Sequence, residues 1–245
     1  MKNKYGLSRN IPEPVKRAVR QACGFGCVIC GCSIIEYAHV DPEFPEAREH
    51  NPSGITLLCP RCHSKLTTGF LSKETVRAAM AEPFCKKAGF SSEIFDLGSV
   101  HPQIVFGGVT LTNCRVPVRV KDLPLFELKE GEGARAPFRL TANFFNSKGQ
   151  PSLMIRDNEW FALASNWDVE VSGGAITIRD EPKHVSLQLV VYPPGGLIVE
   201  RLDMYLYGYH FRGSPDELIV ESPGGLRLVL RSCLVDNCEV GLALG

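Results

Sequence analysis

Two Cys-x-x-Cys pairs constrain the fold of this 245-residue chain more than any other feature of its sequence. Each pair is a short turn that presents two sulfurs to one point, and two such pairs supply the four thiolates that a tetrahedral zinc ion binds. One histidine lies between the pairs and another directly follows the second pair, at His39 and His63. The spacing therefore predicts a small unit held together by structural Zn²⁺. The four expected ligands are Cys27, Cys30, Cys59 and Cys62.

The remaining cysteines do not form a second such pattern. No apolar segment of signal-peptide or membrane-span length occurs, so we expect a cytoplasmic protein without membrane association. In a reducing compartment, clustered cysteines bind metal more often than they form disulfides. Cys23 and Cys32 are expected to be bystanders, with a role as spare ligands left open. Four scattered cysteines are interpreted as small buried side chains or free thiols: Cys85, Cys114, Cys233 and Cys238.

Charge is balanced over the whole chain but not within it. The formal net charge is +0, which excludes a polyelectrolyte that binds through overall charge. The first 35 residues nevertheless hold six basic side chains and one acidic side chain, Glu13. Such a local excess suits a phosphate backbone, and a solvated basic tail is the equal alternative.

The first hundred residues predict short helices around a hairpin. A proline at the first turn and an apolar stripe of helical period favour an N-terminal helix. Ser72 is a good N-cap for a later helix. The expected elements are a helix over 12–22, a strand over 34–40, a loop over 41–54, a strand over 55–58, a helix to about residue 65 and a helix over about 73–80.

After about residue 100 the chain changes to short apolar runs separated by Gly, Pro, Asn and Asp. Alternation of apolar and polar residues predicts half-buried strands. Gly-Gly pairs recur without a fixed period, which favours a β-sandwich over a β-solenoid, the alternative. The expected fold is α+β, with a zinc-bound domain over 1–98 and an all-β domain over 99–245.

Aromatic residues are the main candidates for function in the β-rich half. Trp160 and Trp167 form either a ligand platform or the centre of the core. Tyr205, Tyr207 and Tyr209 are expected on one face of a single strand, where they either stack on bases or form a half-buried sheet face. Because this half contains no catalytic constellation, we expect it to provide specificity, homo-oligomer contacts or a regulatory ligand site.

Residues 27–66 resemble the HNH nucleases, whose site is a zinc-stapled hairpin followed by a helix, the ββα-metal fold. The resemblance covers about 40 residues of the chain. It is specific only when its motifs are taken together. The matching segments are Cys27-x-x-Cys30, Ala38-His39-Val40-x-Pro42 and Leu57-Leu58-Cys59-x-x-Cys62-His63.

The resemblance implies an endonuclease that hydrolyses DNA phosphodiester bonds, with RNA left open as a substrate. His39 takes the position of the general base, and a neutral imidazole can accept a proton near pH 7. His63 matches the position that holds a catalytic cation such as Mg²⁺. Asn51 is the candidate for the middle residue of the signature, and a role in restriction or anti-phage defence fits this class.

Two departures from the family favour an alternative. Ala38 replaces a frequent second metal ligand, and Gly54 stands where the asparagine usually lies. A catalytically degenerate zinc module that binds nucleic acid or protein is therefore the second hypothesis. On that interpretation, His39 is a packed histidine and His63 lies on a helix surface. His50 is expected to be an exposed loop histidine.

Two further interpretations fit parts of the cysteine pattern. The Cys-x-x-Cys-His segment that ends at His63 also matches the attachment pattern of c-type haem. That interpretation leaves Cys27 and Cys30 without a role. A redox protein would instead require thiols that react freely without metal release.

Overall fold

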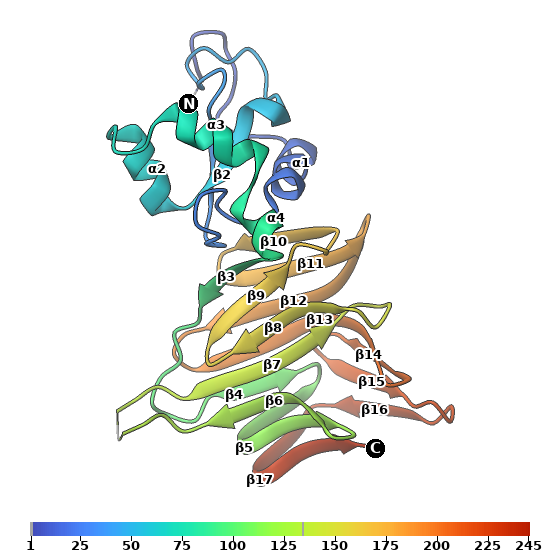
Figure 1. Ribbon diagram of the computed structural model, residues 1–245. Coiled ribbons are helices and arrows are strands. Elements are labelled where there is room, and N and C mark those ends of the chain that lie inside the picture. The colour runs from blue at the N-terminus through green and yellow to red at the C-terminus, as the bar shows by residue number, and fades with distance from the viewer. Residues whose placement is uncertain (1, 134) are drawn as a thin grey trace. The chain divides into compact units, whose positions relative to one another are not determined.

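A computed structural model describes residues 2–133 and 135–245 (Figure 1). The described chain forms two compact units. The first comprises the residues up to Glu93 together with Ala162–Glu170, and the second comprises Ile94–Phe161 and Val171–Gly245. The expected boundary after residue 98 thus lies close to the observed one, but a sequence-distant segment joins the first unit.

The first unit contains the expected helices and hairpin. The strands β1 and β2 pair antiparallel, with Glu36 opposite Leu58 and His39 opposite Ile55. Among the described residues, no helix has the length and apolar character needed to cross a membrane. The elements are α1 (Glu13–Cys23), β1 (Glu36–His39), the 3₁₀ turn η1 (Pro52–Gly54), β2 (Ile55–Leu58), α2 (Pro60–Thr67), α3 (Lys73–Ala81) and α4 (Phe84–Ala88).

Local sequence explains where these helices begin and end. Helix α1 has proline in its first turn and ends at Gly24, whose φ of 73° is accessible to glycine at low cost. The Ser72 side chain accepts a hydrogen bond from the Thr75 amide and so caps α3 as expected. The helix α4 was not predicted, because its five residues lie between Pro83 and Gly89 and are too few to show a helical period.

The core of the first unit lies between the hairpin and the helices. Strand β2 is buried along its whole length, and its side chains pack with those of Val19 from α1 and Val76 from α3. The sulfurs of Cys27, Cys59 and Cys62 belong to the same buried cluster. The hairpin and the cysteine pairs are therefore held by one apolar core.

The second unit is built from strands, which confirms the expected all-β texture. Figure 1 shows these strands side by side in one curled sheet. Neighbouring strands pair antiparallel throughout the run from β11 to β13 and from β4 to β8. Strand β13 pairs with β4, and β17 pairs with β5, in the parallel direction. Three strands of the sheet, β3 (Phe90–Ile94), β9 (Glu159–Leu163) and β10 (Asp168–Ser172), contain residues of both units. The strands that lie wholly in the second unit are β4 (Gln103–Phe106), β5 (Val109–Val120), β6 (Leu123–Lys129), β7 (Arg139–Phe145), β8 (Pro151–Arg156), β11 (Ala175–Glu181), β12 (His184–Tyr192), β13 (Gly196–Leu206), β14 (Tyr209–Gly213), β15 (Glu217–Glu221), β16 (Arg227–Arg231) and β17 (Cys233–Leu244).

Four phenylalanines of this sheet are buried and contact one another. Phe106 contacts Phe126 and Phe211 edge to face, with ring centroids 5.5 and 6.4 Å apart. Phe126 contacts Phe144 in the same way at 5.3 Å. These pairs join β4, β6, β7 and β14, so one aromatic cluster packs together strands that are not all neighbours in the sheet.

Of the aromatic candidates in this half, Trp160 is a core residue, and a turn separates the tyrosines that were expected on one strand. Trp160 is buried and stacks on Phe95, as expected for a core residue. The expectation that three tyrosines share one strand is wrong. Tyr207, with a φ of 51°, lies in the tight turn between β13 and β14, so Tyr205 and Tyr209 belong to different strands.

Candidate functional site

The four predicted zinc ligands come together in the first unit. Their sulfurs all lie within 4.8 Å of one another. The sulfur of Cys30 is 3.6 Å from that of Cys59 and 3.8 Å from that of Cys62. In a tetrahedral site with zinc–sulfur bonds of about 2.3 Å, the sulfurs are about 3.8 Å apart. The four thiols therefore fit a structural zinc ion in kind, number and spacing.

Each cysteine pair is shaped by its local backbone. In the first pair, the Gly31 amide donates to the Cys27 carbonyl at 2.9 Å, which closes the turn. A side chain at position 31 would collide with Phe84, because an added Cβ would lie 2.6 Å from that ring. In the second pair, the Cys59 sulfur caps α2 and accepts from the Cys62 amide at 3.4 Å. A helix N-terminus stabilises a thiolate, so this placement suits a metal ligand.

The environment of these thiols requires a cation if they are to ionise together. Burial raises the pKa of Cys30 to about 11 and also raises the pKa of Cys62. Four neighbouring thiolates in a buried cluster repel one another, and a bound zinc ion supplies the compensating charge. We therefore expect metal binding to release protons and to weaken at low pH.

The bystander cysteines lie outside the four-thiol group, as expected. The Cys23 sulfur contacts the Thr56 hydroxyl at 3.6 Å. The Cys32 thiol donates to the Glu93 carboxylate at 3.0 Å. Neither belongs to the four-thiol group, so neither acts as a spare ligand in this geometry.

His39 and His63 line the same surface cleft, which has a volume of about 650 Å³. His39 is the last residue of β1, and His63 lies in the first turn of α2, directly after a predicted zinc ligand. The cleft is thus formed by the hairpin and helix that the four cysteines join. Its other charged and aromatic lining residues are Arg9, Tyr37, Glu43, Phe44 and Lys73.

His39 is held by a second histidine. Its Nε2 atom lies 3.1 Å from Nδ1 of His50, and its ring meets Phe44 edge to face. Burial lowers the pKa of His39, and the charges of His50 and Arg9 lower it further. The ring is therefore neutral near pH 7 and able to accept a proton.

His50 is not the exposed loop residue that the sequence suggests. Its ring is half-buried, and its Nε2 atom is buried with no hydrogen-bond partner among the described residues. The sequence contains only a weak signal that His50 contacts His39, because His50 lies in a polar loop next to Asn51. Only folding of the 41–54 loop brings it against His39.

His63 has a carboxylate partner that sequence reasoning missed. Its Nδ1 atom contacts the carboxylate of Glu36, the first residue of β1. Glu36 lies two positions before Ala38, and side chains two apart share a face of a strand. This spacing of two residues was the available sequence signal for Glu36. It places a carboxylate on the same strand face as Ala38, which cannot itself bind a metal.

Asn51 serves the loop rather than the cleft lining. Its side-chain oxygen accepts from the amide and the hydroxyl of Ser53, at 3.1 and 2.9 Å, and caps the η1 turn. The residue is exposed and is not among the side chains that line the cleft. The structure thus brings His39 and His63 into one cleft and leaves Asn51 outside it.

Gly54 has no space for the asparagine that the resemblance expects. An added Cβ would lie 2.1 Å from the Asp41 carbonyl oxygen. The Gly54 carbonyl accepts from the amides of Val40 and Asp41, at 2.9 and 3.2 Å. The close approach of these two chain segments, directly after His39, therefore requires glycine.

No family model, curated protein or solved structure matches this chain. A functional interpretation therefore depends on the geometry of the residues in this chain alone. Four clustered thiols suit a structural metal, and two imidazoles with a carboxylate lie on the neighbouring elements. Such a set of groups can bind a hard or borderline cation and accept a proton from water.

Proposed function

We propose that this chain is a zinc-stabilised, metal-dependent endonuclease of the HNH type that hydrolyses phosphodiester bonds in DNA. The observation that carries the proposal is the shared cleft of His39 and His63 beside the four-thiol group. Zinc at the four cysteines would hold the hairpin against α2 and take no part in the reaction. RNA stays open as a substrate, and restriction or anti-phage defence is the proposed biological setting.

His39 is the proposed general base. In the tautomer in which its Nε2–H donates to Nδ1 of His50, the free lone pair of His39 is on Nδ1. That atom would accept the proton of the water that attacks phosphorus. The lowered pKa of His39 keeps the base unprotonated at cellular pH. His50 would fix the ring and is therefore a proposed positioning residue.

His63 and Glu36 are the proposed holders of the divalent cation. One imidazole nitrogen and one carboxylate suit Mg²⁺, which binds few protein ligands and keeps several waters. Such a cation, when bound, stabilises the negative charge that develops on the phosphate and the leaving oxygen. Arg9 and Lys73 add positive groups to the cleft, although Lys73 also pairs with Glu43. A phosphate backbone is the ligand that this combination favours.

The β-rich unit is proposed to set where or when cleavage occurs. Its residues from 101 onward contain more acidic than basic side chains, which argues against a main role in holding DNA. Partner contact, homo-oligomer formation and binding of a regulatory ligand are the roles proposed for it.

A catalytically inactive zinc module that binds nucleic acid is the second candidate. Two observations favour it. Ala38 supplies no ligand, and Gly54 leaves no space for the asparagine of the family. On this alternative, the basic side chains of the cleft bind the phosphate backbone and no bond is broken.

A plasmid-nicking assay separates the two candidates. Zinc-loaded protein is incubated with supercoiled plasmid in Mg²⁺ or Mn²⁺, and nicked product is measured over time. We expect wild type to nick and His39→Ala to lose at least about 100-fold in rate, because general base catalysis contributes roughly that factor or more. Zinc content should stay at about one ion per chain in both proteins.

His101→Ala is the matched control, because it removes a histidine from the second unit. We expect this variant to retain the wild-type rate. If wild type fails to nick in both cations but shifts the same DNA in a gel, the binding module is correct. If His39→Ala nicks as fast as wild type, the assignment of the base is wrong.

A further inference from the structure

Two six-residue segments of the second unit share the pattern Asn-Cys-x-Val at their last four positions. Residues 111–116 read Leu-Thr-Asn-Cys-Arg-Val, and residues 235–240 read Val-Asp-Asn-Cys-Glu-Val. The first copy lies in β5 and the second in β17. Although 124 residues separate the two cysteines, the copies lie side by side as parallel strands.

The two copies pair residue for residue. Cys114 lies opposite Cys238, and Val116 lies opposite Val240. Asn113 and Asn237 both adopt left-handed backbone, with φ of 48° and 55°, so both strands have the same irregularity at the same point. A shared irregularity fixes the register, because a slip of one strand would separate the matching bends.

Polar contacts hold this register on both sides of the cysteines. The Thr112 hydroxyl and the side-chain amide of Asn113 both donate to the same Asp236 carboxylate oxygen, each at 2.8 Å. On the other side, Arg115 Nε donates to Glu239 at 2.5 Å. The cysteine pair is therefore clamped between two cross-strand contacts.

The register places two thiols in contact. The sulfurs of Cys114 and Cys238 are 3.0 Å apart. A disulfide needs Cα atoms about 4.4–6.8 Å apart, and neighbouring strands are separated by about 4.8 Å. The bond length of about 2.05 Å then requires the sulfurs to approach by only about 1 Å. The strands can accept this bond without a change of register.

The two thiols differ in access. Cys114 is fully buried, and burial raises its pKa to about 11. Cys238 is half-buried and lines a surface cleft of about 570 Å³ together with Arg115 and Lys129. A small oxidant can therefore reach the Cys238 sulfur. The Cys114 sulfur lies in contact with Cys238, where it can attack a disulfide formed on Cys238.

We propose that Cys114 and Cys238 are a modification site, which a low-molecular-weight disulfide such as oxidised glutathione converts to an intramolecular disulfide. The Cys238 thiolate attacks one sulfur of the oxidant, forms a mixed disulfide and releases one glutathione thiolate. Cys114 then attacks the Cys238 sulfur, the mixed disulfide breaks, and the Cys114 proton passes to the departing sulfur, so that the second glutathione leaves as a thiol. The protein loses two electrons and the oxidant gains two. This inference is independent of the proposed nuclease activity.

The second step is strongly favoured by the contact between the two sulfurs. It is intramolecular, and the attacking sulfur already lies beside its target. The product would tie β17, which pairs with no strand other than β5 among the described residues, to the body of the sheet. Oxidation should therefore protect the C-terminal segment from local opening.

The test uses full-length, zinc-loaded protein in glutathione buffers of increasing oxidised fraction. After acid quench and alkylation, peptide mapping by mass spectrometry identifies the cross-link. We expect a peptide that joins Cys114 to Cys238 and is about 2 Da lighter than its two reduced parts. We also expect dithiothreitol to reverse it. Hydrogen exchange of residues 233–244 should slow in the oxidised protein by about 10-fold or more.

Two variants make the result decisive. Cys233→Ser removes a neighbouring thiol of the same strand and should leave the cross-link unchanged, which also settles the assignment within a peptide that contains both Cys233 and Cys238. Cys114→Ala should stop the reaction at the mixed disulfide on Cys238. A wild-type protein that accumulates only this mixed disulfide, or that leaves both thiols reduced in fully oxidised glutathione, overturns the proposal.

Discussion

At the scale of single residues, the least replaceable contact is the buried ion pair of Arg20 and Asp168. Arg20 Nε and Nη2 donate to the two Asp168 oxygens, each at 2.8 Å, and Asp168 is completely buried. Arg20 also donates to the Tyr37 hydroxyl, which lines the His39 cleft. A two-pronged pair of this kind fixes the position of α1 relative to the segment 162–170.

Asp168→Ala should lower the free energy of unfolding by about 3–5 kcal/mol, because it leaves the buried Arg20 charge with only the exposed Glu13 as a charged partner among the described residues. Urea denaturation followed by fluorescence measures the change. Glu13→Ala removes an exposed partner of the same arginine and should cost only about 0–1 kcal/mol. Equal losses in the two variants would contradict this account.

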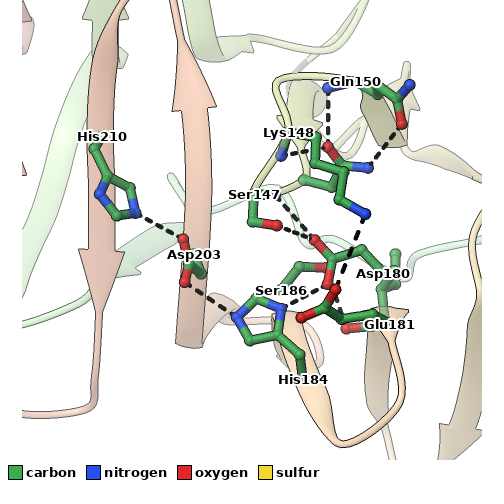
Figure 2. A network of polar contacts seen from close by, with 11 residues as sticks. Ser147, Lys148, Gln150, Asp180, Glu181, His184, Ser186, Asp203 and His210 are labelled. Atoms are coloured by element: carbon green, nitrogen blue, oxygen red, sulfur yellow. Dashed lines mark hydrogen bonds and ion pairs between the residues drawn. The ribbon is translucent and has the colours of Figure 1, made fainter.

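A second residue-scale feature is a chain of imidazoles and carboxylates in the second unit. Figure 2 shows the His184 ring between Asp180 and Asp203, with His210 on the far side of Asp203. The His184 nitrogens lie 2.6 Å from Asp180 and 3.1 Å from Asp203, and His210 Nε2 lies 2.7 Å from Asp203. Because both ring nitrogens of His184 face carboxylates, the doubly protonated imidazolium is the favoured form.

Stability should therefore depend on pH through His184. The hydrogen bond with Asp180 raises the pKa of His184, so its contribution is complete below the ordinary value of about 6.5 and is lost as pH rises through the higher folded value. Burial opposes ionisation of Asp180, but hydrogen bonds from Ser147 and His184 still lower its pKa. The contribution of Asp180 is present above about pH 4 and is lost as pH falls further.

We expect wild type to lose stability as pH rises above about 6.5, and His184→Gln to flatten this decline. Urea denaturation at several pH values measures both slopes, with His101→Gln as the control that keeps the wild-type slope. An unchanged slope in His184→Gln would show that other groups titrate.

At the scale of elements, the sequence predicted what is local and missed what depends on loop folding. Two Cys-x-x-Cys pairs, the Ser72 cap and the apolar strand over 55–58 have near-neighbour causes, and each was recovered. The contacts of His50 and Glu36 depend on how the 41–54 loop returns to β1, and no residue pattern encodes that path. Gly54 illustrates the limit, since its need for glycine arises from the approach of Asp41.

The cysteine group gives the prediction that belongs to this scale. Cys62→Ser should reduce bound zinc to well below one ion per chain and increase hydrogen exchange across β1, β2 and α2, because structural zinc contributes folding free energy directly. Elemental analysis and hydrogen exchange measure the two effects. Cys32→Ser changes a cysteine outside the group and should alter neither. Full zinc content in Cys62→Ser would show that this thiol is not a ligand.

At the scale of the whole molecule, the presence of many short strands was predictable from the sequence, but the order of the strands in the sheet was not. Alternating apolar residues gave an all-β second half, and the structure confirms it. The parallel partners β4 with β13 and β5 with β17 lie about a hundred residues apart in the chain. Such pairings depend on the whole path of the chain, whereas periodicity reports only on single strands. The Asn-Cys segments of β5 and β17 are a long-range signal that the sequence analysis did not use, and the register of the two strands gives it meaning.

The position of Asp168 in the sequence has a consequence for the design of truncated forms of this protein. A truncation just after residue 98 would keep every cysteine of the four-thiol group and both cleft histidines. It would also discard the only carboxylate that fully neutralises a guanidinium in the interior, among the residues that the structure describes. An isolated N-terminal fragment would thus keep the chemistry of the site but leave the buried Arg20 charge with an exposed carboxylate, that of Glu13, as its partner.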